Sequence, residues 1–290
     1  MGSEMCIRDS FQVLQLYMIL GGIPYYLKEI KAGKSAVQNI ADLCFSKTGL
    51  LRREFYNLYS ALFNQPERYI GVIRALATTR QGLDRNSLIK IAGLSNGGTI
   101  SKILTDLEES GFIDVYYPFG KKNKNKIFRL TDEYSLFYLR FIEKHKKEKG
   151  DVWQHISQTQ NFKIWCGYAF ESTCIKHLPQ IKKALGISGI YSSSSSFLKK
   201  GTATEKGAQI DLVIDRNDKT INVFEIKHYS EDVTISKAYA RTLRDKISVF
   251  RRTTKTRKHI YLTFIAPFGL THNINSLGLV DQILTLDDLF

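Results

Sequence analysis

Three side chains that could take part in catalysis or metal binding lie in two short apolar segments. Asp211 is in the first segment, and Glu225 and Lys227 are in the second. β-Branched and other apolar residues dominate both segments, and residues 216–219 between them are polar, so we predict a β-hairpin. Side chains alternate along a strand, so Glu225 and Lys227 point to one face. If the connecting loop holds an odd number of residues, Asp211 faces the same side, level with or diagonal to Glu225.

Such a group of side chains suits a divalent cation. Two neighbouring carboxylates repel each other, and a hard ion such as Mg²⁺ relieves the repulsion while keeping positions open for water. The ion would lower the pKa of its water and polarise a phosphorus centre, while Lys227 would position the water or stabilise developing charge. The alternative is an exposed hairpin with solvated side chains, but an Asp followed by Glu-x-Lys on the next strand favours the cation site.

The same segments resemble a known family. Residues 210–213 (Ile-Asp-Leu-Val) and 223–227 (Val-Phe-Glu-Ile-Lys) resemble the signature of the PD-(D/E)XK nucleases, which have the restriction-endonuclease-like fold. That family carries a further glutamate on a helix before the hairpin, and residues 167–171 (Gly-Tyr-Ala-Phe-Glu) resemble that helix. Gln209 departs from the pattern, since many relatives have an acidic residue there.

The resemblance implies a catalytic site of four side chains. Glu171, Asp211 and Glu225 would bind Mg²⁺ or Mn²⁺, and Lys227 would lie beside the ion. On its apolar helix Glu171 would be partly buried, and a buried carboxylate needs a partner such as a metal ion. An exposed glutamate is the alternative.

Charge and composition favour a nucleic-acid partner. The 290 residues give room for two or three domains, and their 43% apolar and 24% charged content is ordinary for globular proteins. The formal net charge of +14 is not ordinary, and it favours a polyanion: nucleic acid first, an anionic membrane surface second. The four cysteines have no zinc-ligand spacing, and the apolar residues 11–27 are too short and broken to span a bilayer. We expect a cytoplasmic protein without a membrane partner.

A second resemblance covers most of the chain. Residues 21–27 (Gly-Gly-Ile-Pro-Tyr-Tyr-Leu), 55–63 and 66–69 resemble the helical lid that follows the nucleotide-binding core of a group of prokaryotic AAA-type ATPases. In that group a winged helix and a nuclease-like domain follow the lid, and the same order runs from about residue 16 onward. The resemblance implies the C-terminal part of such an ATPase.

ATP would bind only through a nucleotide-binding core, which these residues lack. Residues 32–35 (Ala-Gly-Lys-Ser) look like a phosphate loop, but Lys28 stands where the Walker pattern needs glycine, and a helix is predicted where the pattern needs a strand. We therefore expect no ATP hydrolysis by this chain alone.

We predict four segments along the chain. Residues 1–10 have no apolar period and are interpreted as an artefact or disordered, and residues 11–66 form the helical lid fragment. Residues 67–150 form a winged-helix domain, and residues 151–290 form a nuclease-like α/β domain with a central mixed sheet. The fold class is thus multidomain α+β and α/β.

The winged helix supplies one candidate DNA contact. Three amphipathic helices are followed by two strands with a basic loop between them. This arrangement is typical of DNA-binding winged helices. Two acids near the end of the third helix disfavour phosphate contact there, so a protein-docking role or a solvated lysine loop remains the alternative. The lysines predicted to contact DNA are Lys102, Lys121, Lys122, Lys124 and Lys126.

A second candidate contact lies on the helix predicted for residues 233–254. Lys237, Arg241 and Arg244 recur at i, i+4 and i+7, which suits a phosphodiester backbone beside the carboxylates, with solvated surface as the alternative. The sequence as a whole predicts DNA binding and metal-dependent phosphodiester hydrolysis by the last domain. A catalytically inactive nuclease fold that binds DNA or protein in a regulatory role is the alternative.

Overall fold

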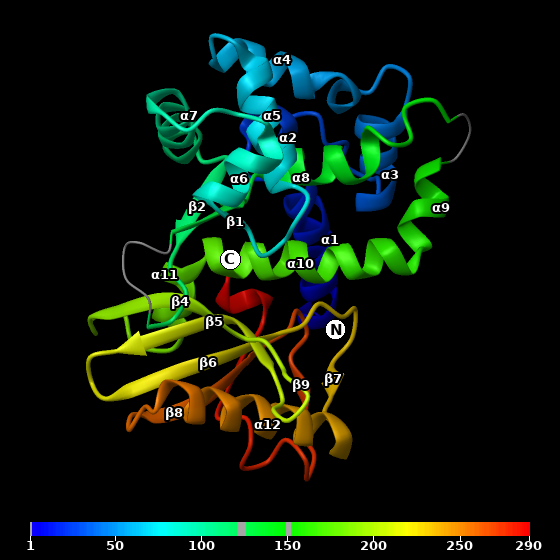
Figure 1. Ribbon diagram of the computed structural model, residues 1–290. Helices are drawn as coiled ribbons and strands as arrows, with labels where there is room; N and C mark the ends of the chain where they lie inside the picture. The colour runs from blue at the N-terminus through cyan, green and yellow to red at the C-terminus, as the bar shows by residue number, and fades with distance from the viewer. Residues whose placement is uncertain (1, 121–125, 149–151) are drawn as a thin grey trace. The chain divides into compact units, whose positions relative to one another are not determined.

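The computed structural model describes residues 2–120, 126–148 and 152–290. These residues form two compact units (Figure 1). The first, here called the helical unit, comprises residues 12–116 and 126–169, and the second, the sheet unit, comprises the described residues of 1–11, 117–125 and 170–290. The chain mixes helices with a five-stranded mixed sheet, which confirms the predicted fold class in its coarse form.

The helical unit begins on helix α1, which turns sharply into the next element. Helix α1 spans Gly2–Leu20, Gly21 follows with a positive φ of 63°, and α2 (Pro24–Leu27) starts with proline in its first turn. Glycine adopts this left-handed conformation without steric cost, and proline suits a helix start. A Cβ on Gly21 would also lie 3.0 Å from Glu133 Oε2, so the backbone approaches this carboxylate closely.

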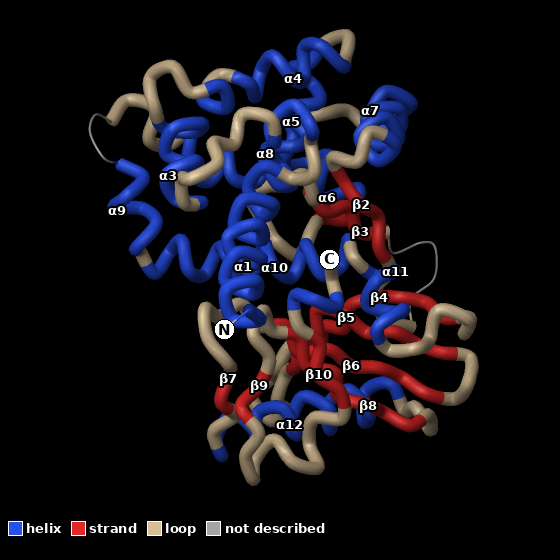
Figure 2. The backbone as a smooth tube through the Cα atoms, turned by 180° about the vertical axis from the view of Figure 1, so that it is seen from behind, coloured by secondary structure: helices blue, strands red, loops and turns tan. Residues whose placement is uncertain are grey.

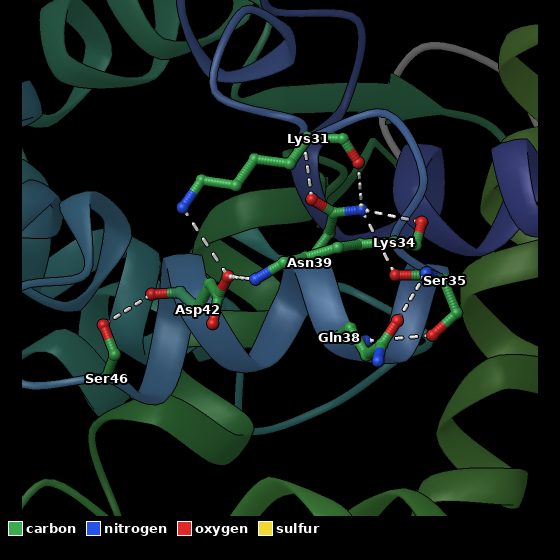
Figure 3. A network of polar contacts seen from close by, with 7 residues as sticks. All are labelled: Lys31, Lys34, Ser35, Gln38, Asn39, Asp42 and Ser46. Atoms are coloured by element: carbon green, nitrogen blue, oxygen red, sulfur yellow. Dashed lines mark hydrogen bonds and ion pairs between the residues drawn. The ribbon is translucent and has the colours of Figure 1, made fainter.

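The loop before α3 (Ala36–Ile40) is held by one buried amide (Figure 3). Asn39, 1% exposed, donates through Nδ2 to the carbonyls of Lys31, Lys34 and Ser35 and accepts from the Lys31 backbone amide through Oδ1. Ser35 caps α3, and Lys34 pairs with Asp42 at 2.6 Å. This lysine is thus engaged as a structural cation in a helical setting, which agrees with rejecting a phosphate loop here.

Further along the helical unit, three helices surround a small antiparallel sheet in the strand order β1-β3-β2. The predicted helices and two strands are present, and β1 is an additional short strand. The elements after α3 are η1 (Ala41–Phe45), η2 (Leu50–Arg52), α4 (Glu54–Leu62), α5 (Pro66–Leu76), β1 (Leu83–Asp84), α6 (Arg85–Ala92), α7 (Gly98–Glu109), β2 (Ile113–Tyr116) and β3 (Ile127–Leu130).

Aromatic rings fill the core of the helical unit. Asp132 caps α8 (Glu133–Phe137) by accepting from the Ser135 amide, and η4 (Tyr138–Ile142) continues it. Phe137 lies 5.5 Å from Trp153 of α9 (Val152–Gln158) and 5.3 Å from Trp165 of α10 (Gln160–Lys176), between ring centroids. This aromatic core therefore includes residues beyond the boundary predicted at residue 150.

The sheet unit is built on a five-stranded sheet with the order β10-β8-β6-β5-β4. Strands β4, β5 and β6 are antiparallel neighbours, while β6, β8 and β10 run parallel. A separate two-stranded sheet pairs β7 with β9 (Figure 2). The elements are α11 (Leu178–Ala184), β4 (Ser192–Lys199), β5 (Ala208–Arg216), β6 (Thr220–Ile226), β7 (Val233–Thr234), α12 (Lys237–Thr254), β8 (His259–Ile265), β9 (Leu270–Thr271), β10 (Gln282–Leu284) and η5 (Leu286–Asp288).

Helix α12 covers one face of this sheet (Figure 1). Leu243 and Phe250 from the helix share a buried cluster with Val213, Val223 and further strand residues. Residues just after β2 also join the unit, because the Phe119 amide donates to the Ser196 carbonyl at 2.8 Å and its ring lies 5.0 Å from that of Phe250. Part of the predicted wing thus packs on the edge strand β4.

Two predicted segment boundaries can be compared with the elements and units of the structure. Residues 2–10, interpreted from composition as an artefact or disordered, lie within the bounds of helix α1. The predicted boundary at residue 150 does not coincide with the division of the chain, since residues 152–169 lie in the helical unit. The physical reason is packing, because Trp153, Phe162 and Trp165 make edge-to-face contacts with the aromatic rings after Asp132.

Candidate functional site

The predicted hairpin is confirmed by β5 and β6. Val213 pairs with Val223 and Asp215 with Ile221 in antiparallel register, and three residues, 217–219, connect the strands. Lys219 adopts a left-handed φ of 61°, which allows the tight turn. The loop is therefore odd in length, and the register, continued beyond Val213, brings Asp211 opposite Glu225.

An irregularity in β5 falls at the predicted carboxylate. The register between β4 and β5 shifts between the pairs Ser195–Val213 and Phe197–Ile210, which leaves Asp211 and Leu212 opposite Ser196. Such a bulge bends a strand and redirects its side chains. Simple alternation from Val213 therefore does not fix the direction of Asp211, whose Oδ1 accepts a hydrogen bond from Gln209 Nε2 at 2.8 Å.

Glu225 is the centre of a buried charged cluster. It is 5% exposed on β6, and its two carboxylate oxygens meet three side-chain groups. Tyr239 donates its hydroxyl to Oε1 at 2.8 Å, and Lys227 Nζ lies 3.0 Å from the same oxygen. Lys246 Nζ donates to Oε2 at 2.7 Å. One buried anion thus contacts two ammonium groups and one hydroxyl.

Charge interactions keep this cluster ionised. Burial raises the pKa of a carboxyl group, but the ammonium groups of Lys227 and Lys246 outweigh burial and hold the pKa of Glu225 below its usual value. Burial also raises the pKa of Tyr239, and the charge of Glu225 raises it further, so the hydroxyl stays a donor. At neutral pH the cluster therefore consists of a carboxylate, two ammonium groups and a neutral phenol.

The four predicted catalytic residues act on one another through Lys227. Burial lowers the pKa of Lys227, but Glu225 and then the negative charges of Glu171 and Asp211 raise it above its usual value. Glu171 comes from α10 and Asp211 from β5, and both are half-buried. Three carboxylates from distant parts of the sequence thus interact with the charge of one ammonium group, that of Lys227.

Two members of the cluster were not predicted. Tyr239 and Lys246 come from α12 and flank Leu243 at spacings of four and three residues, on the side of the helix that packs on the sheet. The sequence does hold a signal for them, because a lysine that recurs with apolar residues at helical spacing is directed toward the core. Such a lysine needs a carboxylate partner there.

The side chains do not fit a metal ion as they stand. The oxygen donors of Glu171, Asp211 and Glu225 suit Mg²⁺ chemically. Among the residues that the structure describes, however, no three Asp, Glu, His or Cys side chains gather as ligands of one ion. The ammonium groups of Lys227 and Lys246 hold the Glu225 oxygens instead.

The predicted basic stripe lies on the opposite side of α12 from the cluster. Lys237, Arg241 and Arg244 are exposed, whereas Tyr239 and Lys246 point to the sheet. The width of the helix, on the order of 10 Å, therefore separates the stripe from Glu225. A polyanion on this stripe would contact the outer face of α12 and not the carboxylates directly.

The lysines predicted on the winged helix are only partly described. Lys102 on α7 and Lys126 before β3 are exposed. Lys121, Lys122 and Lys124 lie outside the described residues.

His228, next to Lys227, lies in an aromatic environment. Its ring is 5.3 Å from that of Phe11 and 5.7 Å from that of Phe170, between centroids. Nε2 is buried and has no hydrogen-bond partner among the described residues. Burial lowers the pKa of His228 to about 4, so the imidazole is neutral at neutral pH.

Comparison with known proteins finds one distant relative, an uncharacterized protein of Methanocaldococcus jannaschii, MJECL04. It is 24% identical over 221 residues, which cover 74% of this chain and 48% of that protein. The chain thus spans about half the length of the relative. No family model and no solved structure matches the chain. Within the described ranges, no helix has both the length and the apolar character needed to cross a bilayer.

Proposed function

We propose that the sheet unit is a PD-(D/E)XK-like module that binds nucleic acid, DNA above all, and hydrolyses its phosphodiester bonds with Mg²⁺ or Mn²⁺. The observation that carries the proposal is the contact of Lys227 Nζ with Glu225 Oε1 at 3.0 Å, supported by the charge interactions of Lys227 with Glu171 and Asp211. Convergence of groups from different elements on one side chain is typical of a functional site. Asp211, Glu225 and Glu171 would hold the ion, which would lower the pKa of a bound water and neutralise phosphate charge.

The protonation states assign distinct roles to the protein groups. The raised pKa of Lys227 makes this side chain an ammonium group at neutral pH, so it donates to and neutralises an oxyanion but does not act as a base. Gln209 fixes the Asp211 carboxylate from the same strand. Tyr239 holds Glu225 in one orientation without changing its charge.

For the rest of the chain we propose a lid fragment and a winged helix, arranged as in the C-terminal part of an AAA-type ATPase. The order of α5, α6, α7 and the sheet β1-β3-β2 supports the winged helix. The Methanocaldococcus protein is about twice as long as its matched segment, which leaves room for a nucleotide-binding core. ATP would enter the function only through such a core, and the wing or α7 would contact DNA or a protein partner.

A cleavage assay tests the proposed activity. Labelled duplex and single-stranded DNA and RNA would be incubated with wild type, Asp211→Ala and Lys227→Ala, each with Mg²⁺, Mn²⁺ or a chelator. We expect metal-dependent cleavage by wild type and a loss of at least about a hundredfold in either variant, since each removes transition-state stabilisation. Cleavage that survives in Asp211→Ala would assign the activity elsewhere.

A binding-only module is the second candidate. It is favoured by the engagement of Glu225 with two ammonium groups, which leaves its oxygens occupied. In that case wild type binds nucleic acid without cutting it, and Lys237, Arg241 and Arg244 supply the contact. Replacing these three by glutamine would reduce the magnitude of the slope of log K against log salt concentration by about two to three, because each phosphate contact contributes about 0.9 to that slope. An unchanged slope would remove the stripe from the interface.

A further inference from the structure

Lys246, which contacts Glu225, is not among the four residues first predicted for the site. Lys246 Nζ lies 2.7 Å from Glu225 Oε2, and Lys227 Nζ lies 3.0 Å from Oε1. Glu225 is 5% exposed, so both ammonium groups act on it with little screening by water. A divalent cation on the same carboxylate would meet strong repulsion from both.

The two lysines differ in how they are attached. Lys227 follows Glu225 on the same strand, and its backbone amide donates to the Ile265 carbonyl at 2.9 Å, so its position is tied to the sheet. Lys246 comes from α12, and its side chain is 27% exposed, against 35% for Lys227. Because Lys246 is not part of the sheet, rotation of its side chain would move its head group from Glu225 to water without any change in the sheet.

We propose that Lys246 is a built-in counter-ion that occupies the cation position on Glu225 and must leave it before a divalent ion binds. The site then alternates between a lysine-paired resting state and a metal-bound state. This inference rests on the proposed function, because it takes Glu225 as a cation-binding residue.

Calorimetric titration with Mg²⁺ and with Mn²⁺ alone, at low salt and without nucleic acid, tests the inference. Removing the competing charge in Lys246→Met should raise the affinity for the ion at least tenfold over wild type. Lys246→Gln keeps a donor for Oε2 without the charge and should show a similar gain, whereas Lys246→Arg should resemble wild type. The gain should disappear in Lys246→Met/Glu225→Gln, which locates it at Glu225.

A control variant separates the charge at the site from net charge. Lys183→Met removes an exposed charge on α11, away from the Glu225 cluster. It should change the affinity by less than about threefold. A gain in Lys183→Met equal to that in Lys246→Met would mean that only net charge matters, which overturns the proposal.

Equal affinity in wild type and both neutral variants would also overturn the proposal, as would the absence of binding in all of them. Failure of both Lys246→Met and Lys246→Gln to fold would show that the lysine is an obligatory structural partner and not an exchangeable one. The outcome is independent of the cleavage assay. Asp211-dependent cleavage without a gain in affinity rejects only the counter-ion, whereas a gain without cleavage rejects only the nuclease.

Discussion

In the helical unit, the buried hydroxyls of Tyr59 and Ser135 lie 2.9 Å apart, and the Tyr134 hydroxyl donates to the Leu51 carbonyl at 2.6 Å. In the sheet unit, the buried carboxylate of Glu225 meets two ammonium groups. The first cluster is neutral, and each buried hydroxyl in it has a hydrogen-bond partner. The requirement that buried polar groups be hydrogen-bonded is enough to explain it. The second brings an excess of charge into a low-dielectric site.

We propose that this difference separates a structural cluster from a functional one. Buried ion pairs contribute little net stability, because the cost of removing charges from water offsets their attraction. Net stability therefore gives little reason to bury a glutamate beside two lysines while Asp211 and Glu171 also act on Lys227. Under the proposed function, chemistry on a charged substrate would give such a reason.

Glu225→Ala should have the largest effect on stability. It leaves the ammonium group of Lys227, whose backbone is tied to the sheet, without its buried anion, and breaking such a pair costs about 3–5 kcal/mol. Urea unfolding of wild type and variant would measure the cost. A loss below about 1 kcal/mol would mean that the lysines turn to water freely, and the contrast between the clusters would then lose its energetic basis.

A pH-dependent effect of somewhat smaller size is expected at His228. Its pKa is lowered to about 4 in the folded protein, while the unfolded chain binds a proton near pH 6.5. Between these values the unfolded state binds more protons, so stability falls as the pH falls, by at most about 3 kcal/mol. Above pH 6.5 this contribution is fully present.

Unfolding measured at pH 7 and pH 5 checks the effect and avoids the range in which carboxylates titrate. His228→Phe fits the aromatic environment of Phe11 and Phe170 and has no titrating group. The difference between the two pH values should shrink in this variant. An equal difference in wild type and variant would assign the pH dependence to other groups.

The neutral cluster should show the smallest effect. Ser135→Ala leaves the Tyr59 hydroxyl buried without its partner and should cost about 1–2 kcal/mol. Tyr59→Phe/Ser135→Ala removes both polar groups and should recover part of that loss. Thermal unfolding of the single and double variants measures this. If the double variant loses more unfolding free energy than the two single variants together, the hydroxyl pair does more than provide each hydroxyl with a hydrogen-bond partner.

The sequence predicts much of the local structure because local rules decide it. Alternating apolar residues and a polar loop predict the hairpin β5–β6, and in the structure glycine and proline likewise mark the break after α1 and Asp132 the start of α8. Each of these depends on residues within a few positions of one another. Glu225 and Lys227 could be placed on one face for the same reason, since they are two residues apart on one strand.

The rest depends on contacts between distant segments. Which lysine of α12 reaches Glu225 is set by the rotation of the helix against the sheet, so Lys246 was missed while the outward stripe was noticed. The bulge at Asp211 arises from pairing with β4, and the packing of Phe119 on Phe250 arises from the same edge. Neither is encoded in a short window.

The most direct test of the central claim, that these carboxylates form a cation site, is a calorimetric Mn²⁺ titration of wild type and Asp211→Ala. We predict one bound ion per chain in wild type and an affinity at least tenfold lower in the variant, because the ion loses one of its carboxylate ligands. Superimposable titrations of the two proteins would contradict the assignment of Asp211 and, with it, the proposed site.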